Sequence, residues 1–182
     1  MKFIATAIPD VVLIAPQVFG DERGYFMEVW HERKFESGGL PLRFVQDNQS
    51  RSRRNILRGL HYQVRQPQGK LVRTLIGEIF DVAVDLRKRS PTFGRWVGAT
   101  LSADNKHQLY IPPGFAHGFL VTSDLADVEY KCTDFYAPEH ERSLAWNDPS
   151  VGVVWPLAPG VAPVLSAKDQ AGALLGAAEV FE

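Results

Sequence analysis

From residue 56 onward, short apolar runs alternate with polar turns along the chain. Within these runs, apolar and polar positions often follow a period of two, which is the period of a β-strand. Glycine, proline, aspartate or asparagine separates the runs at short intervals, a spacing typical of antiparallel sandwiches and barrels. The pattern predicts strands over residues 56–63, 70–76, 78–86, 95–101, 107–111, 116–122 and 126–133.

The first residues of the chain show a different pattern. Residues 2–19 contain short β-rich runs interrupted by Pro9 and Pro16. Prolines of this kind are confined to sheet edges, so we expect edge strands or an arm exchanged with a second copy. This N-terminal arm covers about residues 1–19, and a charged turn leading into a further strand follows at 21–30.

Helical patterns are few and short. Residues 32–37 can form one or two turns of helix, and alanine and leucine over about 167–178 predict a short C-terminal helix. The polar residues 46–55 predict a loop. No repeat, linker or low-complexity block divides the chain, so we expect one domain over 1–182. The predicted fold is a mostly-β jelly roll with short peripheral helices.

Composition narrows the class of protein. The chain has 182 residues, 45% of them apolar and 23% charged, as in ordinary soluble globular proteins. Its net charge of −1 argues against a nucleic-acid binder, although it permits a local anion site. The lone Cys132 excludes an internal disulfide and fits a reducing compartment. Since the sequence shows neither a secretory signal nor a bilayer-length apolar run, we expect a cytoplasmic protein without membrane partners.

The strand-like run 57–63 is the first stretch with candidate chemistry. On a regular strand Arg58 and His61 would point to opposite faces. Gly59 between them permits a bend and a close approach of another backbone or a ligand, which could bring both side chains into one site. His61 has no second histidine one or two residues on, and this favours acid–base chemistry over metal ligation.

A second candidate lies in the run 111–119. Its Pro-x-Gly-x-x-His spacing predicts a tight turn that delivers His117 to the start of a strand, and it resembles the second motif of the cupin superfamily of small jelly-roll barrels. Metal-binding cupins also carry a His-x-His pair, where this chain has His61-Tyr62-Gln63. Transition metals require several imidazole or carboxylate ligands, so we expect no metal site. The alternative for His117 is a buried, hydrogen-bonded histidine.

A narrower resemblance covers roughly residues 20 to 170. Six motifs occur in the same order as in the dTDP-4-dehydrorhamnose 3,5-epimerase family, which makes the match far more specific than any single motif. The motifs are Arg23–Phe26, Gln46–Asn48, Leu57–Gln63, Ser90–Trp96, Pro112–Phe119 and Trp146–Pro149.

This resemblance implies a cofactor-independent, cupin-type homodimeric isomerase. Its substrate would be a nucleotide-linked sugar, dTDP-4-dehydro-6-deoxy-D-glucose. Epimerisation at C3 and C5 would give dTDP-4-dehydro-L-rhamnose, on the way to dTDP-L-rhamnose and the polysaccharides that contain it. Nothing in the resemblance implies a nucleic-acid partner.

Inverting a carbon beside a ketone requires a base on one face, an acid on the other, and a group that stabilises the enolate oxygen. His61 suits the base because an unperturbed imidazole titrates near 6.5. The resemblance implies Asp169 as its orienting carboxylate, Tyr130 as the proton donor and Lys70 as the enolate stabiliser. Without the resemblance, Tyr130 would be interpreted as an aromatic residue packed in a strand, and Lys70 as a lysine at the surface.

The resemblance also implies groups that bind the substrate. Arg23 and Arg58 would meet the diphosphate or the sugar, since a guanidinium pairs with phosphate oxygens in a fork. The full set of implied binding residues is Arg23, Phe26, Glu28, Gln46, Asn48, Arg58, His117, Glu141 and Lys168.

Two further groups of charged residues stay open. Arg51, Arg53 and Arg54 either strengthen the positive field near the diphosphate or form a solvated loop face, and we favour the solvated face. Asp81 and Asp85 share one face of a predicted strand and could be paired carboxylates. Alternatively, Asp81 could be the partner of a site histidine.

Three other functions remain as alternatives. A mono-epimerase acting only at C3 or C5 of a related keto-deoxysugar would share most of these motifs. A metal-dependent cupin and a non-catalytic carbohydrate-binding cupin belong to different classes, which metal analysis and turnover would separate.

Overall fold

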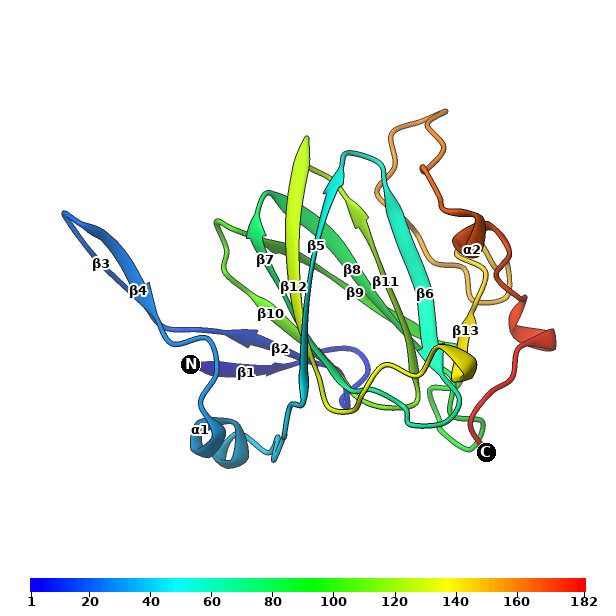
Figure 1. Ribbon diagram of the computed structural model, residues 1–182, viewed down its shortest axis with the longest axis horizontal. Helices are drawn as coiled ribbons and strands as arrows, with labels where there is room; N and C mark the ends of the chain where they lie inside the picture. The colour runs from blue at the N-terminus through cyan, green and yellow to red at the C-terminus, as the bar shows by residue number, and fades with distance from the viewer.

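The computed structural model describes all 182 residues, and two antiparallel sheets face one another in it (Figure 1). The six-stranded sheet has the order β1-β2-β10-β7-β12-β5 and the five-stranded sheet the order β13-β6-β11-β8-β9, while β3 and β4 form a separate hairpin. The strands are β1 (Lys2–Ala5), β2 (Val12–Ala15), β3 (Val18–Asp21), β4 (Gly24–Met27), β5 (Gln46–Arg53), β6 (Leu57–Gln63), β7 (Lys70–Ile76), β8 (Glu78–Asp85), β9 (Trp96–Ser102), β10 (Gln108–Ile111), β11 (Phe115–Val121), β12 (Leu125–Cys132) and β13 (Glu141–Ser143). The helices are α1 (Glu32–Ser37) and α2 (Ala167–Gln170), with 3-10 turns η1 (Pro138–His140) and η2 (Leu175–Ala177).

The arrangement is the predicted mostly-β jelly roll, and all seven strands expected from residue 56 onward are present within one residue of the expected bounds. Every residue of the central strand β11 is buried. Its inner face packs into the apolar core between the sheets, through Phe115 and Phe119. Its outer face packs through Ala116 and Leu120 under the C-terminal residues. The sequence of a strand that is covered on both faces is a continuous apolar run and does not alternate between apolar and polar residues.

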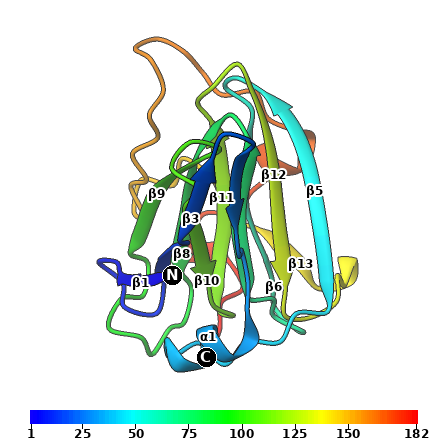
Figure 2. The same ribbon diagram turned by 90° about the vertical axis from the view of Figure 1, so that its left-hand side faces the viewer.

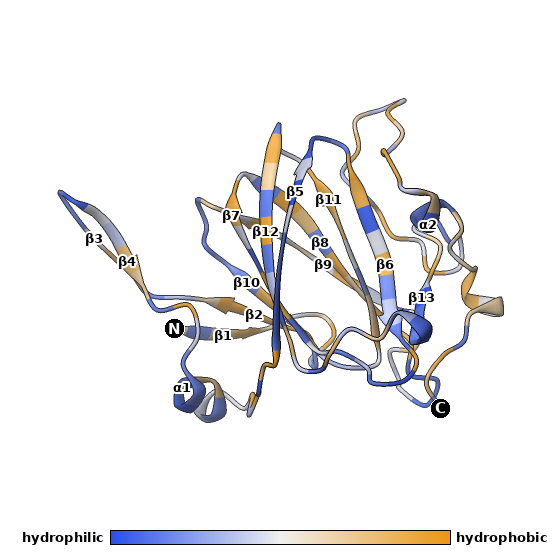
Figure 3. Cartoon of the chain, viewed as in Figure 1, coloured by the Kyte–Doolittle hydropathy of each residue, from blue (hydrophilic) through white to orange (hydrophobic).

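The predicted loop at residues 46–55 is wrong, because β5 occupies Gln46–Arg53 and pairs with β12 along its whole length. Its burial still alternates, with Gln46, Asn48 and Ser50 partly covered and their neighbours exposed. The inward face of β5 borders a polar cavity instead of the apolar core, so both of its faces carry polar residues (Figure 3). Hydrophobic periodicity therefore could not reveal this strand.

Residues 2–15 form two strands at one end of the chain's own sheet, where β1 is the edge strand and β2 pairs with both β1 and β10. What projects from the barrel is the β3–β4 hairpin that follows (Figures 1 and 2). Phe19 is 55% exposed and Phe26 71% exposed on this hairpin. The expected helix α1 is present, and its buried Phe35 packs edge-on against Phe3 with ring centroids 5.2 Å apart.

The C-terminal residues cross the outer face of the five-stranded sheet near β6 and β13 (Figure 1). The prediction of a helix reaching residue 178 is wrong, since α2 ends at Gln170 and only η2 follows. A Cβ on Gly172 would lie 2.8 Å from the backbone of Ala145, so the chain runs extended against the sheet there. None of the helices has the length and apolar character needed to cross a membrane.

Candidate active site

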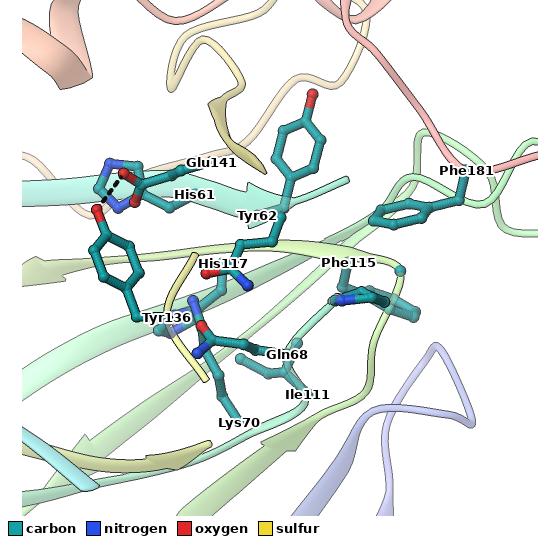
Figure 4. Close-up of a pocket in the computed structure, with 13 residues that line it drawn as sticks. His61, Tyr62, Gln68, Lys70, Ile111, Phe115, His117, Tyr136, Glu141 and Phe181 are labelled. Atoms are coloured by element: carbon teal, nitrogen blue, oxygen red, sulfur yellow. Dashed lines mark hydrogen bonds between the residues drawn. The ribbon is translucent and has the colours of Figure 1, made fainter. Parts of the chain in front are cut away.

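A cavity of about 410 Å³ opens between the two sheets, and its walls are mainly polar. A smaller chamber of about 30 Å³ adjoins it and shares His61, Lys70, His117 and Glu141 with it (Figure 4). The cavity is lined by Gln46, Asn48, Ser50, Arg58, His61, Gln68, Lys70, His117, Phe119, Tyr130, Tyr136, Glu141, Ser166, Lys168 and Asp169.

His61 on β6 is paired with a carboxylate from the C-terminal part of the chain. Its Nε2 donates to Oδ1 of Asp169 over 2.7 Å, although the two residues are 108 positions apart. Asp169 is almost completely buried, whereas the His61 side chain is 23% exposed toward the cavity. The bond to Asp169 leaves Nδ1 as the ring nitrogen available to a substrate.

Asp169 is itself held by local hydrogen bonds. It forms a capping box with Ser166, whose hydroxyl donates to Oδ2 over 2.6 Å, and the backbone N–H of Gly59 donates to Oδ1 over 3.1 Å. A carboxylate anchored in this way fixes the tautomer and the orientation of the neighbouring imidazole.

The bend in β6 depends on Gly59. Its φ is +131°, and a Cβ at this position would lie 2.5 Å from Cα of Gly118 on the neighbouring strand. The register between β6 and β11 shifts at the same place. Because of this bend, Arg58 and His61 both line the cavity, which a regular strand would not allow.

Burial and charge keep His61 neutral. Burial lowers the pKa of His61 to about 4, with a further decrease from the positive charge of Lys168, and the opposing effect of Asp169 is smaller. Burial alone would raise the pKa of Asp169, but its hydrogen bonds from Ser166 and Gly59 outweigh that effect and lower it. At neutral pH the pair is therefore a neutral imidazole beside an ionised carboxylate.

The opposite sheet contributes Tyr130 on β12 and Lys70 on β7. The Lys70 ammonium lies 5.9 Å from the centroid of the Tyr130 ring, and the ring centroids of Tyr130 and His117 are 6.4 Å apart across the cavity. Burial raises the pKa of the Tyr130 hydroxyl and lowers the pKa of Lys70. A protonated phenol and the Lys70 amino group therefore face the histidines from the other sheet.

The rim of the cavity is built from polar side chains. The Lys168 ammonium pairs with Oε1 of Glu141 over 2.7 Å, and the Tyr136 hydroxyl donates to Oε2 of the same carboxylate over 2.9 Å (Figure 4). On β5 the Gln46 amide donates to Oδ1 of Asn48 over 3.0 Å. Near the bend, Nε of Arg58 donates to the hydroxyl of Ser52 over 2.9 Å.

The structure brings ten of the thirteen sequence-predicted site residues to this cavity. The ten are His61, Lys70, Tyr130, Asp169, Gln46, Asn48, Arg58, His117, Glu141 and Lys168. Arg23 and Phe26 instead lie exposed on the β3–β4 hairpin, where they border a hollow of their own. Glu28 follows the hairpin and pairs with Lys34 of α1 over 2.8 Å.

Sequence reasoning missed Ser50, Gln68, Phe119, Tyr136 and Ser166, which also line the cavity. Only Ser166 carried a readable signal, because Ser166-x-x-Asp169 has the spacing of a helix capping box. Ser50 and Tyr136 lie in a strand and a loop that the sequence did not define.

Gln63 lines the smaller chamber, and local hydrogen bonds hold its side-chain amide. Its amide nitrogen donates to the carbonyl oxygens of Gln66 and Phe135, and its amide oxygen accepts from the N–H of Ala137. Nowhere in the structure do three or more His, Cys, Asp and Glu side chains gather as metal ligands would.

The remaining charged candidates have local partners. Arg51 forms a bidentate pair with Asp127, and Arg54 pairs with Asp124, both outside the cavity. Asp85 accepts hydrogen bonds from Arg87 and from two hydroxyls of the following turn. Burial opposes ionisation of Asp85, but these hydrogen bonds outweigh it and lower its pKa to about 2. Asp81 and Asp85 are therefore not a carboxylate pair, because each is bonded to different partners.

A jelly roll with a neutral histidine bonded to an ionised aspartate on one sheet, and a phenol and a lysine on the other, defines a cupin-type acid–base enzyme. The family model described as dTDP-4-dehydrorhamnose 3,5-epimerase matches residues 5–176. The chain belongs to the dTDP-4-dehydrorhamnose 3,5-epimerase family.

Individual relatives agree with this membership. The dTDP-4-dehydrorhamnose 3,5-epimerase of Pseudomonas aeruginosa is 59% identical over 182 residues, covering 100% of this chain and 99% of that protein. The enzyme of the same name from Salmonella typhimurium is 54% identical and covers 100% of both chains. A crystal structure of dTDP-6-deoxy-D-glucose-3,5-epimerase from Legionella pneumophila, in complex with dTDP-4-keto-L-rhamnose, is 52% identical with a TM-score of 0.94, covering 98% of this chain and 94% of that one.

Proposed function

We propose that the protein is a dTDP-4-dehydrorhamnose 3,5-epimerase that converts dTDP-4-dehydro-6-deoxy-D-glucose to dTDP-4-dehydro-L-rhamnose. The observation that carries this proposal is the placement of His61 and Tyr130 on opposite sheets across one cavity. Inversion requires proton removal on one face of a carbon and proton return on the other. The full-length similarity to enzymes of this name supports the substrate.

In the first step, Nδ1 of His61 takes the proton from the carbon beside the C4 ketone. The electron pair of the broken C–H bond moves into the ring, and negative charge develops on the C4 oxygen as an enolate forms. Asp169 then stabilises the imidazolium, to which it is already hydrogen-bonded over 2.7 Å. Because His61 is neutral at working pH, it needs no prior deprotonation.

In the second step, the Tyr130 hydroxyl gives its proton to the opposite face of the same carbon. The enolate electron pair forms the new C–H bond, the ketone is restored and a phenolate remains on Tyr130. Lys70 lies beside this donor and would stabilise the enolate oxygen by charge and hydrogen bonding. Before the second cycle, the His61 imidazolium gives its proton to solvent and the Tyr130 phenolate takes one from solvent, so the same two groups can act again at the other carbon.

The outer part of the cavity suits the nucleotide. Arg58 would bind the diphosphate in a charge-assisted fork, and the amides of Gln46 and Asn48 offer donors and acceptors to the base or the deoxyribose. Lys168 and Glu141 form a polar wall on the side of His61.

We further propose a cytoplasmic homodimer in which the β3–β4 hairpin of one subunit completes the cavity of the other. The hairpin projects from the barrel (Figure 1), and it carries Arg23, whose side chain is 89% exposed, and the exposed Phe26. An exposed aromatic hairpin carrying a guanidinium matches what the mouth of a nucleotide-binding cavity needs. A free, buried thiol at Cys132 supports a reducing compartment.

Turnover in deuterated water tests the proposed function. With dTDP-4-dehydro-6-deoxy-D-glucose as substrate, we expect deuterium at both C3 and C5 and inversion at both carbons. Label and inversion at one carbon would identify a mono-epimerase, and ligand binding without any exchange would identify a binding protein. Full activity in excess chelator would eliminate a metal-dependent cupin.

A further inference from the structure

A second His–Asp pair lies next to the first, and the reaction described above does not use it. His117 on β11 is the register partner of His61 on β6, so the two imidazoles are cross-strand neighbours. Nε2 of His117 bonds Oδ1 of Asp81 over 2.7 Å, the same atom pair and distance as in the His61–Asp169 pair. Both histidines line the cavity.

The two carboxylates differ in their remaining hydrogen bonds. Asp169 accepts from Gly59 and from both donors of Ser166 in addition to His61, so several donors share its charge. Asp81 is completely buried, and its Oδ2 has no hydrogen-bond partner. The negative charge of Asp81 is therefore neutralised by direct hydrogen bonding only at His117.

Electrostatics favours a charged partner for Asp81. Burying an isolated carboxylate costs several kcal/mol unless a cation is bonded to it. Asp81 is bonded to His117, and the other ionisable groups that line the cavity with it are Arg58, His61, Lys70, Tyr130, Tyr136, Glu141, Lys168 and Asp169. The charge of Asp81 acts on Lys70 through space, but the two side chains form no ion pair. His117 is thus the one group placed to carry the compensating proton.

We propose that Asp81 is a positioning residue that holds His117 as a doubly protonated imidazolium. His117 then has a spare N–H at Nδ1, which faces the cavity as a donor. His61 offers a lone pair at the same ring position. Two cross-strand histidines with the same pairing thereby take opposite roles, because only one of the two carboxylates has other donors.

This charge assignment also has a consequence for catalysis, which rests on the proposed function. An N–H at Nδ1 of His117 would add a cationic donor beside Lys70 for the negative charge that develops on the substrate. Replacing Asp81 by asparagine would leave His117 neutral and remove that charge. We expect kcat to fall about 10- to 100-fold, while KM changes far less, because an interaction made mainly in the transition state is lost.

Nitrogen NMR on the whole protein tests the charge state without any substrate. The chain has five histidines, and His61→Gln and His117→Gln variants assign the two signals of interest. In ¹⁵N-histidine-labelled protein at pH 7, we expect imidazolium shifts on both ring nitrogens of His117 and neutral, Nε2-protonated shifts on His61. A neutral His117 in the unsubstituted protein would overturn the proposal, whatever reaction the enzyme catalyses.

Two aspartate variants on the same strand complete the test. In Asp81→Asn, His117 should change to neutral shifts and kcat should fall while KM is largely kept. Asp85→Asn is the matched control, because Asp85 is equally buried on β8 but bonds Arg87 rather than a histidine. It should lower thermal stability and leave both histidine signals unchanged. An unchanged His117 signal in Asp81→Asn would contradict the role of Asp81.

Discussion

The two sheets that enclose the cavity contribute opposite kinds of chemistry. The five-stranded sheet holds His61, the proposed proton acceptor, with the Asp169 carboxylate bonded to it. The six-stranded sheet holds Tyr130, the proposed proton donor, and Lys70, the proposed enolate stabiliser, together with the amides of β5. Since a jelly roll places its two sheets face to face, a substrate between them meets an acceptor on one side and donors on the other.

Burial has different consequences on the two sides, and both consequences serve proton transfer. On the His61 side burial disfavours the imidazolium, which keeps the base free. On the Tyr130 side burial disfavours the phenolate, which keeps the acid protonated. One low-dielectric cavity therefore prepares a base and an acid together, and inversion of a stereocentre follows from the architecture of the sheets.

Removing the acceptor should have the largest effect. In His61→Ala we expect turnover to fall roughly 10³- to 10⁴-fold, because no other group is placed to take the proton. Steady-state kinetics with the sugar nucleotide measures this. His107→Ala, a histidine outside the cavity, is the matched control and should retain the full rate. A His61→Ala rate within tenfold of the unsubstituted enzyme would place the base elsewhere.

Removing the cation on the donor side should have the next largest effect. Lys70→Met keeps the length of the side chain and removes the ammonium, so we expect kcat to fall about 10²- to 10³-fold. Lys131→Met tests the same change outside the cavity, since Lys131 pairs with Asp47 at the surface, and its rate should be unchanged. Equal losses in the two variants would point to a general structural effect.

The bend that brings Arg58 and His61 together can be tested through Gly59. In Gly59→Ala the added Cβ would meet Gly118 at 2.5 Å in a backbone with φ of +131°. We expect the free energy of unfolding to fall by about 2–4 kcal/mol, from strain and overpacking. Gly160→Ala carries positive φ without any neighbour within 4 Å, and it should cost about 1 kcal/mol. Equal costs in denaturant unfolding would mean that the close approach of β11 is unimportant.

The acid side of the pH profile reports the neutral state of His61. With a pKa of about 4 in the folded protein, kcat/KM should stay level from neutral pH down to about pH 5 and then fall. The unfolded chain protonates this histidine near 6.5. Between those values the unfolded state binds more protons, so stability also decreases as the pH falls.

Lys168→Met sharpens this prediction, because Lys168 contributes to the low pKa of His61. The acid limb of kcat/KM should move toward higher pH in this variant. A limb near 6.5 in the unsubstituted enzyme would show that the cavity does not depress the pKa of its base.

Mixing of variant subunits has the smallest expected effect. It tests whether the two sheets of one subunit form a complete active site or need the hairpin of the partner subunit. Arg23→Ala and His61→Ala subunits are each expected to be weakly active alone. If the hairpin acts across the dimer, co-refolded mixtures should regain about a quarter of the activity, because half of the dimers carry one complete site out of two. A mixture of His61→Ala and Lys70→Met subunits, altered within one cavity, should regain nothing. No recovery with Arg23→Ala would place the hairpin outside the partner's site.

Much of the fold was predictable because strands that pack against an apolar core show a recognisable pattern of apolar residues in the sequence. The apolar strands β6 to β12 were located within one residue of their ends. Strand β5 was missed because its inward residues, such as Asn48, face a polar cavity. The C-terminal helix was overextended because alanine and leucine favour a helix locally, whereas in the folded chain Gly172 lies against the backbone of Ala145 and only the 3-10 turn η2 follows.

The sequence could predict which residues belong to the site but not how they are arranged in space. Family motifs named His61, Tyr130 and Asp169, yet no local pattern joins residues 108 positions apart. The opposed placement of base and acid depends on which strands share a sheet, and that is a property of long-range pairing. The hydrogen bonds that distinguish Asp81 from Asp169 are likewise set only by the folded chain.

The opposed placement of base and acid is tested most directly by following proton exchange and inversion separately in Tyr130→Phe. In deuterated water, we expect this variant still to exchange the proton at C3 or C5 for deuterium through His61. Inversion should fall about 10²- to 10³-fold because the proton donor on the opposite face has been removed. His61→Ala should lose both exchange and inversion. Exchange that is lost in Tyr130→Phe but retained in His61→Ala would contradict the assignment of the base to one sheet and the acid to the other.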